Sequence, residues 1–239
     1  MTATRQERSP QATKRLARLT GALYVSLAVA TLFGYYHAPL VLDDLNAIAR
    51  TITAPDLRFR IGVMSDVLSM VLAVPFTLML YQLLKPVNET LAALTALLQL
   101  VAIPVTLVVA LNYVAAQTLL TNVPDLSAFT DAQREALGML FLRIHAHGVL
   151  AEEIFWGLWL FPFGLLVIRS QFLPRVLGIL LIIAGVGYAA HSITSLLLGG
   201  QRIELYERLT MLARAGELPV MLWLLIKGAD SRRAASRAA

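Results

Sequence analysis

The sequence predicts an all-α protein, a polytopic transmembrane helical bundle with six spans and both termini in the cytoplasm. Of its 239 residues, 58% are hydrophobic and only 15% are charged, and the mean hydropathy is +0.70. This composition is far more apolar than that of an ordinary soluble domain. The apolar residues also occur in runs of about 20, the length at which an α-helix crosses a hydrocarbon core of about 30 Å.

Turn and helix-start residues separate the apolar runs. Pro86 and Asn88 end one helix and start the next, and Thr130 and Asp131 are helix-start signals. The predicted spans cover residues 16–36, 57–84, 91–120, 140–168, 176–198 and 205–226. The polar connection at residues 37–56 is expected to hold a short amphipathic helix.

The predicted organisation is a single membrane domain between two tails. Residues 1–15 form a basic cytoplasmic tail, residues 16–228 form the six-span domain, and residues 229–239 form a second basic tail. Of the 20 Lys and Arg residues, 12 lie in the tails, within a few residues of the tails, or beside the turns that follow spans two and four. The positive-inside rule places that side in the cytoplasm, and the expected location is the cell inner (cytoplasmic) membrane.

Composition also limits the classes of partner and chemistry. The net charge of +5 comes from basic residues beside the spans, where topology and anionic lipid explain them, so the lipid bilayer is the expected partner and nucleic acid is not. The absence of cysteine excludes disulfides, thiolate metal sites and cysteine nucleophiles. The sequence contains neither a phosphate-binding glycine loop nor a serine elbow, and no residue pattern points to a cofactor.

Counting residues from the sharp cytoplasmic turns gives the depth of each polar side chain. Glu217 is the deepest charge, about 15 Å below the outer boundary at a rise of about 1.5 Å per residue. A charge at that depth should face the bundle interior and have a partner. Arg214, three residues earlier on the same helical face, is the expected partner.

The other polar residues are shallower, and all lie in the outer half. Glu152 and Glu153 are about 5 Å inside the boundary, whereas His145 and His147 lie at or above it. The sequence therefore predicts a polar pocket in the outer half of the membrane that binds a small or lipidic ligand, with Glu217 at its deepest point. The candidate ligand-binding residues are Glu217, Arg214, Asp66, Glu152, His191 and Asn112, although for Asn112 an interhelical hydrogen bond is the favoured explanation.

Two alternative functions and one structural explanation stay open at this point. Glu217, Glu152 and Asp66 could supply acid and base groups to an intramembrane enzyme acting on a lipid or isoprenoid-like substrate. A small transporter is disfavoured by the apolar inner half and by the absence of a visible repeat. In the structural explanation, Glu217 pairs with Arg214 to fix helix packing, and Arg60 or interfacial water satisfies Asp66.

A metal site is not predicted, although the residue types would permit one. His145, His147 and Glu153 are the weak candidates, because imidazole and carboxylate groups bind zinc and other divalent metals. Their spacing matches no metal signature such as H-E-x-x-H. A polar helix end at the membrane interface is the simpler interpretation.

Three long stretches resemble a known family. "RIGVMSDVLSMVLAVPFTLMLYQLLKPVNETLAAL", "IFWGLWLFPFGLLVIRSQFLPRVLGILLIIAGVGY" and "GELPVMLWLLIKG" are similar to the bacterial integral-membrane family catalogued as domain of unknown function 4386. The markers are Arg60, Asp66, the "LLKPVN" and "SQFLPR" turns, and Glu217 with "LWLLIKG". The resemblance extends from about Leu16 to Gly228. It implies a multi-pass bacterial membrane protein without an assigned activity and carries over no catalytic residues.

Overall fold

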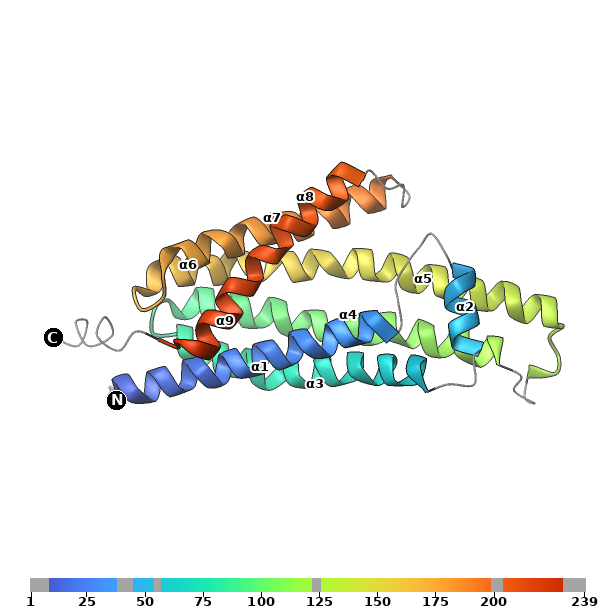
Figure 1. Cartoon of the computed structure of the whole chain (residues 1–239), viewed down its shortest axis with the longest axis horizontal. Helices are drawn as coiled ribbons and strands as arrows, with labels where there is room; N and C mark the ends of the chain where they lie inside the picture. Colours follow the sequence, from blue (N-terminus) through green and yellow to red (C-terminus); the bar gives the residue numbers. More distant parts are fainter. Residues whose placement is uncertain (1–8, 38–44, 54–56, 122–125, 199–203, 230–239) are drawn as a thin grey trace.

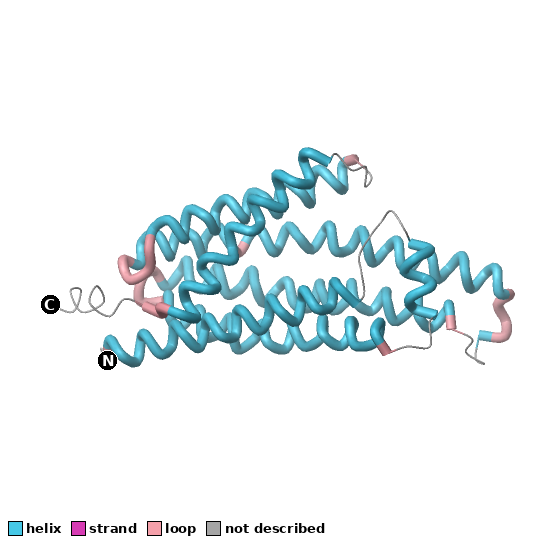
Figure 2. Tube along the Cα trace, in the orientation of Figure 1, coloured by secondary structure: helices cyan, strands magenta, loops and turns pink. Residues whose placement is uncertain are grey.

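The structure, a computed structural model, describes residues 9–37, 45–53, 57–121, 126–198 and 204–229, and within these ranges every regular element is a helix (Figures 1 and 2). Six helical stretches are long and apolar enough to cross a membrane, which confirms the predicted number of spans. The elements are α1 (Pro10–His37), α2 (Leu45–Thr53), α3 (Arg58–Leu84), α4 (Glu89–Leu120), α5 (Asp131–Leu158), α6 (Leu160–Ser170), α7 (Arg175–Leu197), α8 (Glu204–Arg214), the 3₁₀ turn η3 (Ala215–Glu217) and α9 (Leu218–Ile226).

The turns follow the predicted signals. The Asn88 side chain caps α4 by accepting a 2.9 Å hydrogen bond from the backbone nitrogen of Leu91. Thr130 caps α5 in a capping box, in which the Gln133 side chain accepts a 2.9 Å bond from the Thr130 backbone nitrogen. The α3–α4 and α6–α7 turns lie at the same end of the bundle as both ends of the chain (Figure 1).

The fourth span differs from the single predicted helix over residues 140–168. It consists of α5 and α6, which meet at Trp159 and together cover residues Asp131–Ser170. Pro162 explains the break, because it has no N–H to donate to the carbonyl of Leu158. The stretch of 40 residues is longer than a bilayer core requires, and the first turns of α5 pack with α2 and α4 around a second small core. That core contains Ile52, Phe59, Tyr113, Ala116 and Leu142.

The sixth span is also interrupted, at the residue that the sequence places deepest. Helix α8 ends at Arg214, η3 carries the chain through Glu217, and α9 begins at Leu218 with Pro219 in its first turn. Gly216 lies against helix α7, where a Cβ would come within 2.6 Å of the carbonyl oxygen of Leu180. The break lets the two halves pack separately, α8 on α7 and α9 on α1, and α8 diverges from α1 in Figure 1.

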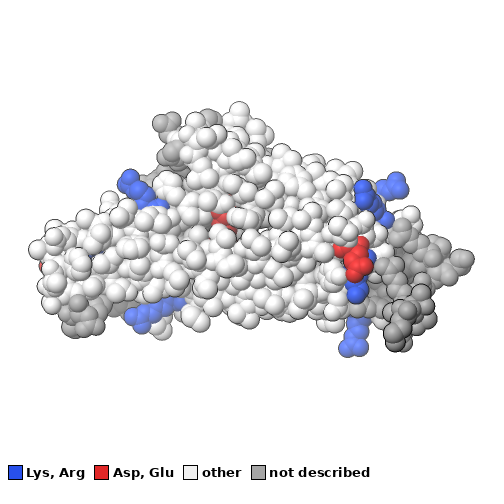
Figure 3. All heavy atoms as spheres, turned by 180° about the vertical axis from the view of Figure 1, so that it is seen from behind, with Lys and Arg blue, Asp and Glu red and all other residues white. Residues whose placement is uncertain are grey.

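The surface has the charge distribution of a protein embedded in lipid. Figure 3 shows basic side chains in two zones toward the ends of the molecule. No Lys or Arg is visible in the broad belt between these zones, where a few acidic atoms reach the surface. Exposed apolar side chains such as Leu68, Val71, Val108 and Ile183 belong to the predicted spans. This surface fits a lipid bilayer, because apolar side chains can face hydrocarbon without a cost in free energy.

The absence of cysteine makes the predicted orientation easy to test. Ser9, at the end of the bundle near both termini, and exposed Ser127, before α5, can each be changed to a single reactive cysteine. We expect a membrane-impermeant maleimide to label Ser127→Cys in intact cells and to label Ser9→Cys only after permeabilisation. The reverse pattern would contradict cytoplasmic termini.

Candidate functional site

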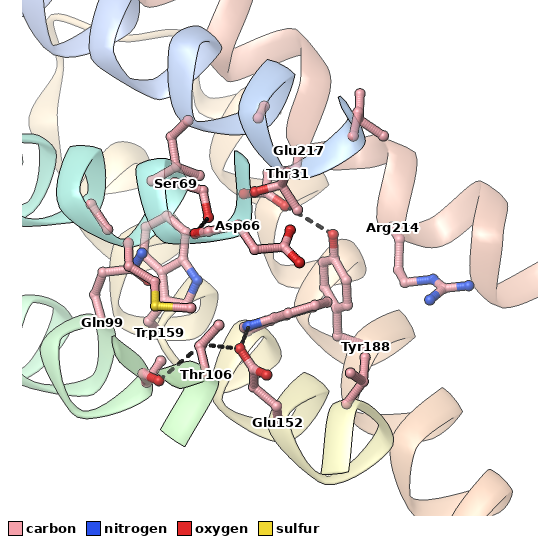
Figure 4. Close-up of a pocket in the computed structure, with 18 of the residues that line it drawn as sticks. Thr31, Asp66, Ser69, Gln99, Thr106, Glu152, Trp159, Tyr188, Arg214 and Glu217 are labelled. Carbon is pink, nitrogen blue, oxygen red and sulfur yellow. Dashed lines mark hydrogen bonds between the residues drawn. The ribbon is translucent and has the colours of Figure 1, made fainter. Parts of the chain in front are cut away.

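A cavity of about 400 Å³ lies inside the bundle, and five acidic or basic side chains share its mainly apolar wall (Figure 4). These side chains are Asp66 from α3, His145 and Glu152 from α5, Arg214 from α8 and Glu217 from η3. Four of the six predicted ligand-binding residues therefore meet at one place. The other two, His191 and Asn112, are not among the residues that line it.

Two tyrosine hydroxyls bind Glu217. Tyr24 of α1 donates to one carboxyl oxygen, and Tyr188 of α7 donates to the other at 3.3 Å. These two hydrogen bonds explain how a carboxyl group is held within a membrane-spanning segment, where an unpartnered polar group is costly.

The predicted pairing of Glu217 with Arg214 is wrong. Arg214 instead forms an ion pair with Glu153, with 3.1 Å between Nη1 and Oε1, and its guanidinium carbon lies 5.7 Å from the centre of the Tyr188 ring. The Tyr188 side chain thus contacts both residues, and Figure 4 shows Arg214 pointing away from Glu217. The reason is the helix break, since Arg214 ends α8 and reaches toward α5 while Glu217, in η3, reaches toward α1.

The adjacent residues Glu152 and Glu153 point to different places. Glu152 faces the cavity and accepts hydrogen bonds from the Thr106 hydroxyl and, at 3.0 Å, from Nε1 of Trp156 (Figure 4). Glu153 faces α7, where its Oε2 lies 2.5 Å from Nδ1 of His191. Nε2 of His191 in turn lies 3.1 Å from Oε2 of Glu207 on α8. His191 therefore belongs to an ion-pair network beside the cavity and not to its wall.

Asp66 is the carboxyl group whose partner the protein does not supply. Its carboxyl points toward the centre of the cavity in Figure 4, and within the described residues no side chain or backbone group donates a hydrogen bond to it. The expected partner Arg60 is exposed at the first turns of α3 and forms no ion pair with it in this part of the chain. Gly34 of α1 makes the close approach possible, because a Cβ there would overlap Oδ1 of Asp66.

His145 lines the cavity and does not lie at the exposed interface that residue counting predicted. Its side chain is 3% exposed, and its ring stacks on Tyr113 with the ring centres 3.6 Å apart. Nδ1 donates to the carbonyl oxygen of Val109 at 2.7 Å, whereas Nε2 is buried without a partner. The depth count failed because α5 extends beyond the length of a membrane span and is covered there by α2 and α4.

The weak metal candidates do not converge. His147 contacts the carbonyl oxygen of Arg143 in its own helix at 2.8 Å, His145 contacts Val109, and Glu153 contacts His191 and Arg214. Across the described ranges, no three His, Cys, Asp or Glu residues form a group that could hold a metal. The amide nitrogen of Asn112 donates within its own helix, to the carbonyl oxygens of Val108 and Val109.

An apolar layer separates the cavity from the end of the bundle that holds the termini. Tyr24 packs on Phe76 with ring centres 4.5 Å apart, and Trp159 stacks on Phe163 at 5.4 Å. Behind these rings lie fully buried side chains, which include Leu80, Leu160, Leu166, Leu181 and Leu224. The polar lining therefore does not continue toward the termini.

The cavity opens sideways, where α1 and the α8–α9 segment separate. Leu32, Met211 and Leu218 all line it, and they are respectively 64%, 59% and 50% exposed. All three belong to helical stretches that are long and apolar enough to cross a membrane. The opening is therefore rimmed by apolar side chains.

Sequence reasoning missed four contributors to this site: Tyr24, Thr106, Tyr188 and the inward-facing His145. A usable signal existed for the tyrosines, because a carboxyl in the membrane interior needs hydrogen-bond donors and Tyr24 and Tyr188 lie within predicted spans. The sequence did not indicate which donor meets which carboxyl. That pairing depends on how α1, α7 and η3 pack together.

The comparisons with known proteins agree with the resemblance found in the sequence. A family model described as "Domain of unknown function (DUF4386)" matches residues 19–228. An uncharacterized protein of Archaeoglobus fulgidus is 31% identical over 162 residues, which make up 67% of this chain and 80% of that protein. No solved structure matches the chain.

Proposed function

Because the chain belongs to the DUF4386 family, which has no assigned activity, we propose a function from the cavity itself: the protein binds one small amphiphilic or lipidic molecule. The sideways opening is the observation that carries this proposal. A molecule dissolved in the bilayer could enter between α1 and the α8–α9 segment without crossing water. Its polar head would then reach the carboxyl groups while its tail stayed against apolar side chains.

The dimensions and chemistry of the cavity support this function. Its volume of about 400 Å³ falls in the range of sites that bind small molecules. Such sites combine a mostly apolar wall with a few polar groups that fix orientation. Here the polar groups are the carboxyls of Asp66, Glu152 and Glu217, and the wall includes Met70, Ile103 and Met221.

The charge distribution supports a location for the cavity within the membrane. The cavity lies on the side of the apolar layer away from the termini, and the basic side chains near the termini favour a cytoplasmic position for that end. We therefore assign the cavity to the outer half of the cytoplasmic membrane. The same apolar layer disfavours a transporter, because transport would require a polar route through the inner half.

Filling the cavity should release the bound molecule. Thr31 of α1 lines the cavity and is only half-buried, so a tryptophan at this position would occupy space that a close-packed interior cannot share with a ligand. We expect lipid extracts of purified Thr31→Trp protein to contain about tenfold less of the co-purifying molecule than wild type, as measured by untargeted mass spectrometry.

Thr118→Trp is the matched control, because Thr118 is exposed on α4 and does not line the cavity. Its extract should match that of wild type. Identical extracts from all three proteins would contradict the proposed function.

A further inference from the structure

Two hydrogen-bond acceptors of the cavity residues, the Asp66 carboxyl and Nε2 of His145, receive no donor from the described residues and indicate which head group the ligand carries. We propose that this head group is a primary amine, bound as an ammonium by Asp66 and His145, on a molecule with a long apolar chain. The inference rests on the proposed function and adds to it the chemical class of the ligand.

The first argument is the number of hydrogen-bond donors that each carboxyl receives. Glu152 accepts from Thr106 and Trp156, and Glu217 accepts from two tyrosines. Asp66 accepts from no described residue, although its carboxyl points to the centre of the same cavity (Figure 4). Asp66 is half-buried and lines the cavity, so a donor on the ligand would fill this acceptor.

The second, independent argument is the unpartnered nitrogen of His145. Because the carbonyl oxygen of Val109 can only accept, Nδ1 of His145 must carry the hydrogen of their 2.7 Å bond. The neutral ring then leaves Nε2 as an acceptor, and that atom is buried without a partner. Asp66 and His145 both line this cavity.

The third argument is the charge of the lining. The wall contains the three carboxyl groups of Asp66, Glu152 and Glu217. Arg214 is the one Lys or Arg residue among the described residues that line the cavity, and Glu153 holds it. A positively charged ligand would be attracted to this wall, whereas the carboxyls would repel a phosphate or carboxylate head.

An ammonium meets all three requirements. It carries a positive charge and three N–H donors, so it has a donor for Asp66 and another for Nε2 of His145. A hydroxyl head offers one donor and no charge, and a quaternary ammonium offers charge but no donor. These three head groups on the same apolar chain therefore separate the contributions of charge and hydrogen bonding.

The test measures binding of dodecylamine, dodecanol and dodecyltrimethylammonium to the purified full-length protein in a non-ionic detergent. Trp156 and Trp159 line the cavity, so a change in tryptophan fluorescence reports occupancy. We expect dodecylamine to bind at least about tenfold more tightly than either other probe, because hydrogen bonds between charged partners are about twice as strong as neutral ones.

Substitutions of Asp66 and His145 then test whether these residues contact the ammonium group. Asp66→Asn should weaken dodecylamine binding about tenfold and leave dodecanol binding unchanged. Asp131→Asn is the control, because Asp131 is exposed at the start of α5, and it should bind all three probes as wild type does. If Asp66→Asn does not fold, His145→Phe retains the ring that stacks on Tyr113, removes Nε2, and should also weaken dodecylamine binding.

The outcomes separate this inference from the proposed function. Equal affinities for dodecylamine and dodecanol would overturn the amine head but leave a cavity that binds amphiphiles. Dodecylamine binding that is unchanged in Asp66→Asn and His145→Phe would overturn the assigned contacts. If no probe binds saturably and Thr31→Trp leaves the lipid extract unchanged, both proposals fail.

Discussion

Glu153→Ala is expected to lower the free energy of unfolding by about 3 kcal/mol, because it removes the shared partner of two basic groups inside the bundle. Glu153 is 5% exposed and contacts both Arg214 and Nδ1 of His191. Without its carboxylate, the guanidinium of Arg214 loses its ion-pair partner, and His191 keeps only Glu207. Unfolding in mixed micelles of a non-ionic detergent and an increasing fraction of SDS would measure the change.

Two further variants separate loss of pairing from loss of side-chain volume. Glu135→Ala changes the same residue type at an exposed position of the same helix and should have little effect on unfolding. The double variant Glu153→Met with Arg214→Met should recover much of the lost stability, because an apolar pair can replace a buried ion pair at little cost. If the double variant is no more stable than Glu153→Ala, the ion pair is not the source of the effect.

Gly21→Ala is expected to lower the free energy of unfolding by about 2 kcal/mol through overpacking between α1 and α9. A Cβ at this position would overlap the backbone nitrogen of Leu225 and lie 2.6 Å from the carbonyl carbon of Leu224. Both atoms belong to the backbone of a packed helix, so neither can move aside without shifting α9. Thermal unfolding in detergent should show a lower midpoint than wild type.

Gly138→Ala is the matched control. A Cβ there would meet only side-chain atoms of Leu120, the nearest at 2.7 Å, and that side chain can adopt another rotamer. Since alanine is favoured over glycine in a helix by about 1 kcal/mol, this variant should unfold near the wild-type midpoint. Equal destabilisation by the two substitutions would show that backbone contact at Gly21 is not the deciding factor.

The six spans could be predicted because each depends on the residues of that span alone. Crossing a hydrocarbon core requires a run of apolar residues of fixed length, and such a run is visible wherever it occurs. The same local reasoning identified the Asn88 and Thr130 caps, whose partners lie three residues away. It failed at Trp159 and Glu217, where prolines three and two residues further along and contacts with other helices interrupt long apolar runs.

The candidate site could be predicted in part. An isolated charge in the membrane interior is costly, so Glu217, Glu152 and Asp66 had to face the bundle, and the structure places all three on one cavity. Their partners were not predictable in the same way. Arg214 was assigned to Glu217 from helical spacing, but the break at η3 directs it to Glu153, 61 positions away.

The sequence by itself determined that this chain is a six-span helical membrane protein of the DUF4386 family with several carboxyl groups facing inward. Only the tertiary structure decided that two tyrosines hold Glu217, that Asp66 and Nε2 of His145 receive no described donor, and that the cavity opens between α1 and α8–α9. The physical reason is the range of the interactions. Hydropathy and capping act over a few neighbouring residues, whereas the donors and walls of the cavity come from helices that meet only when the bundle is packed.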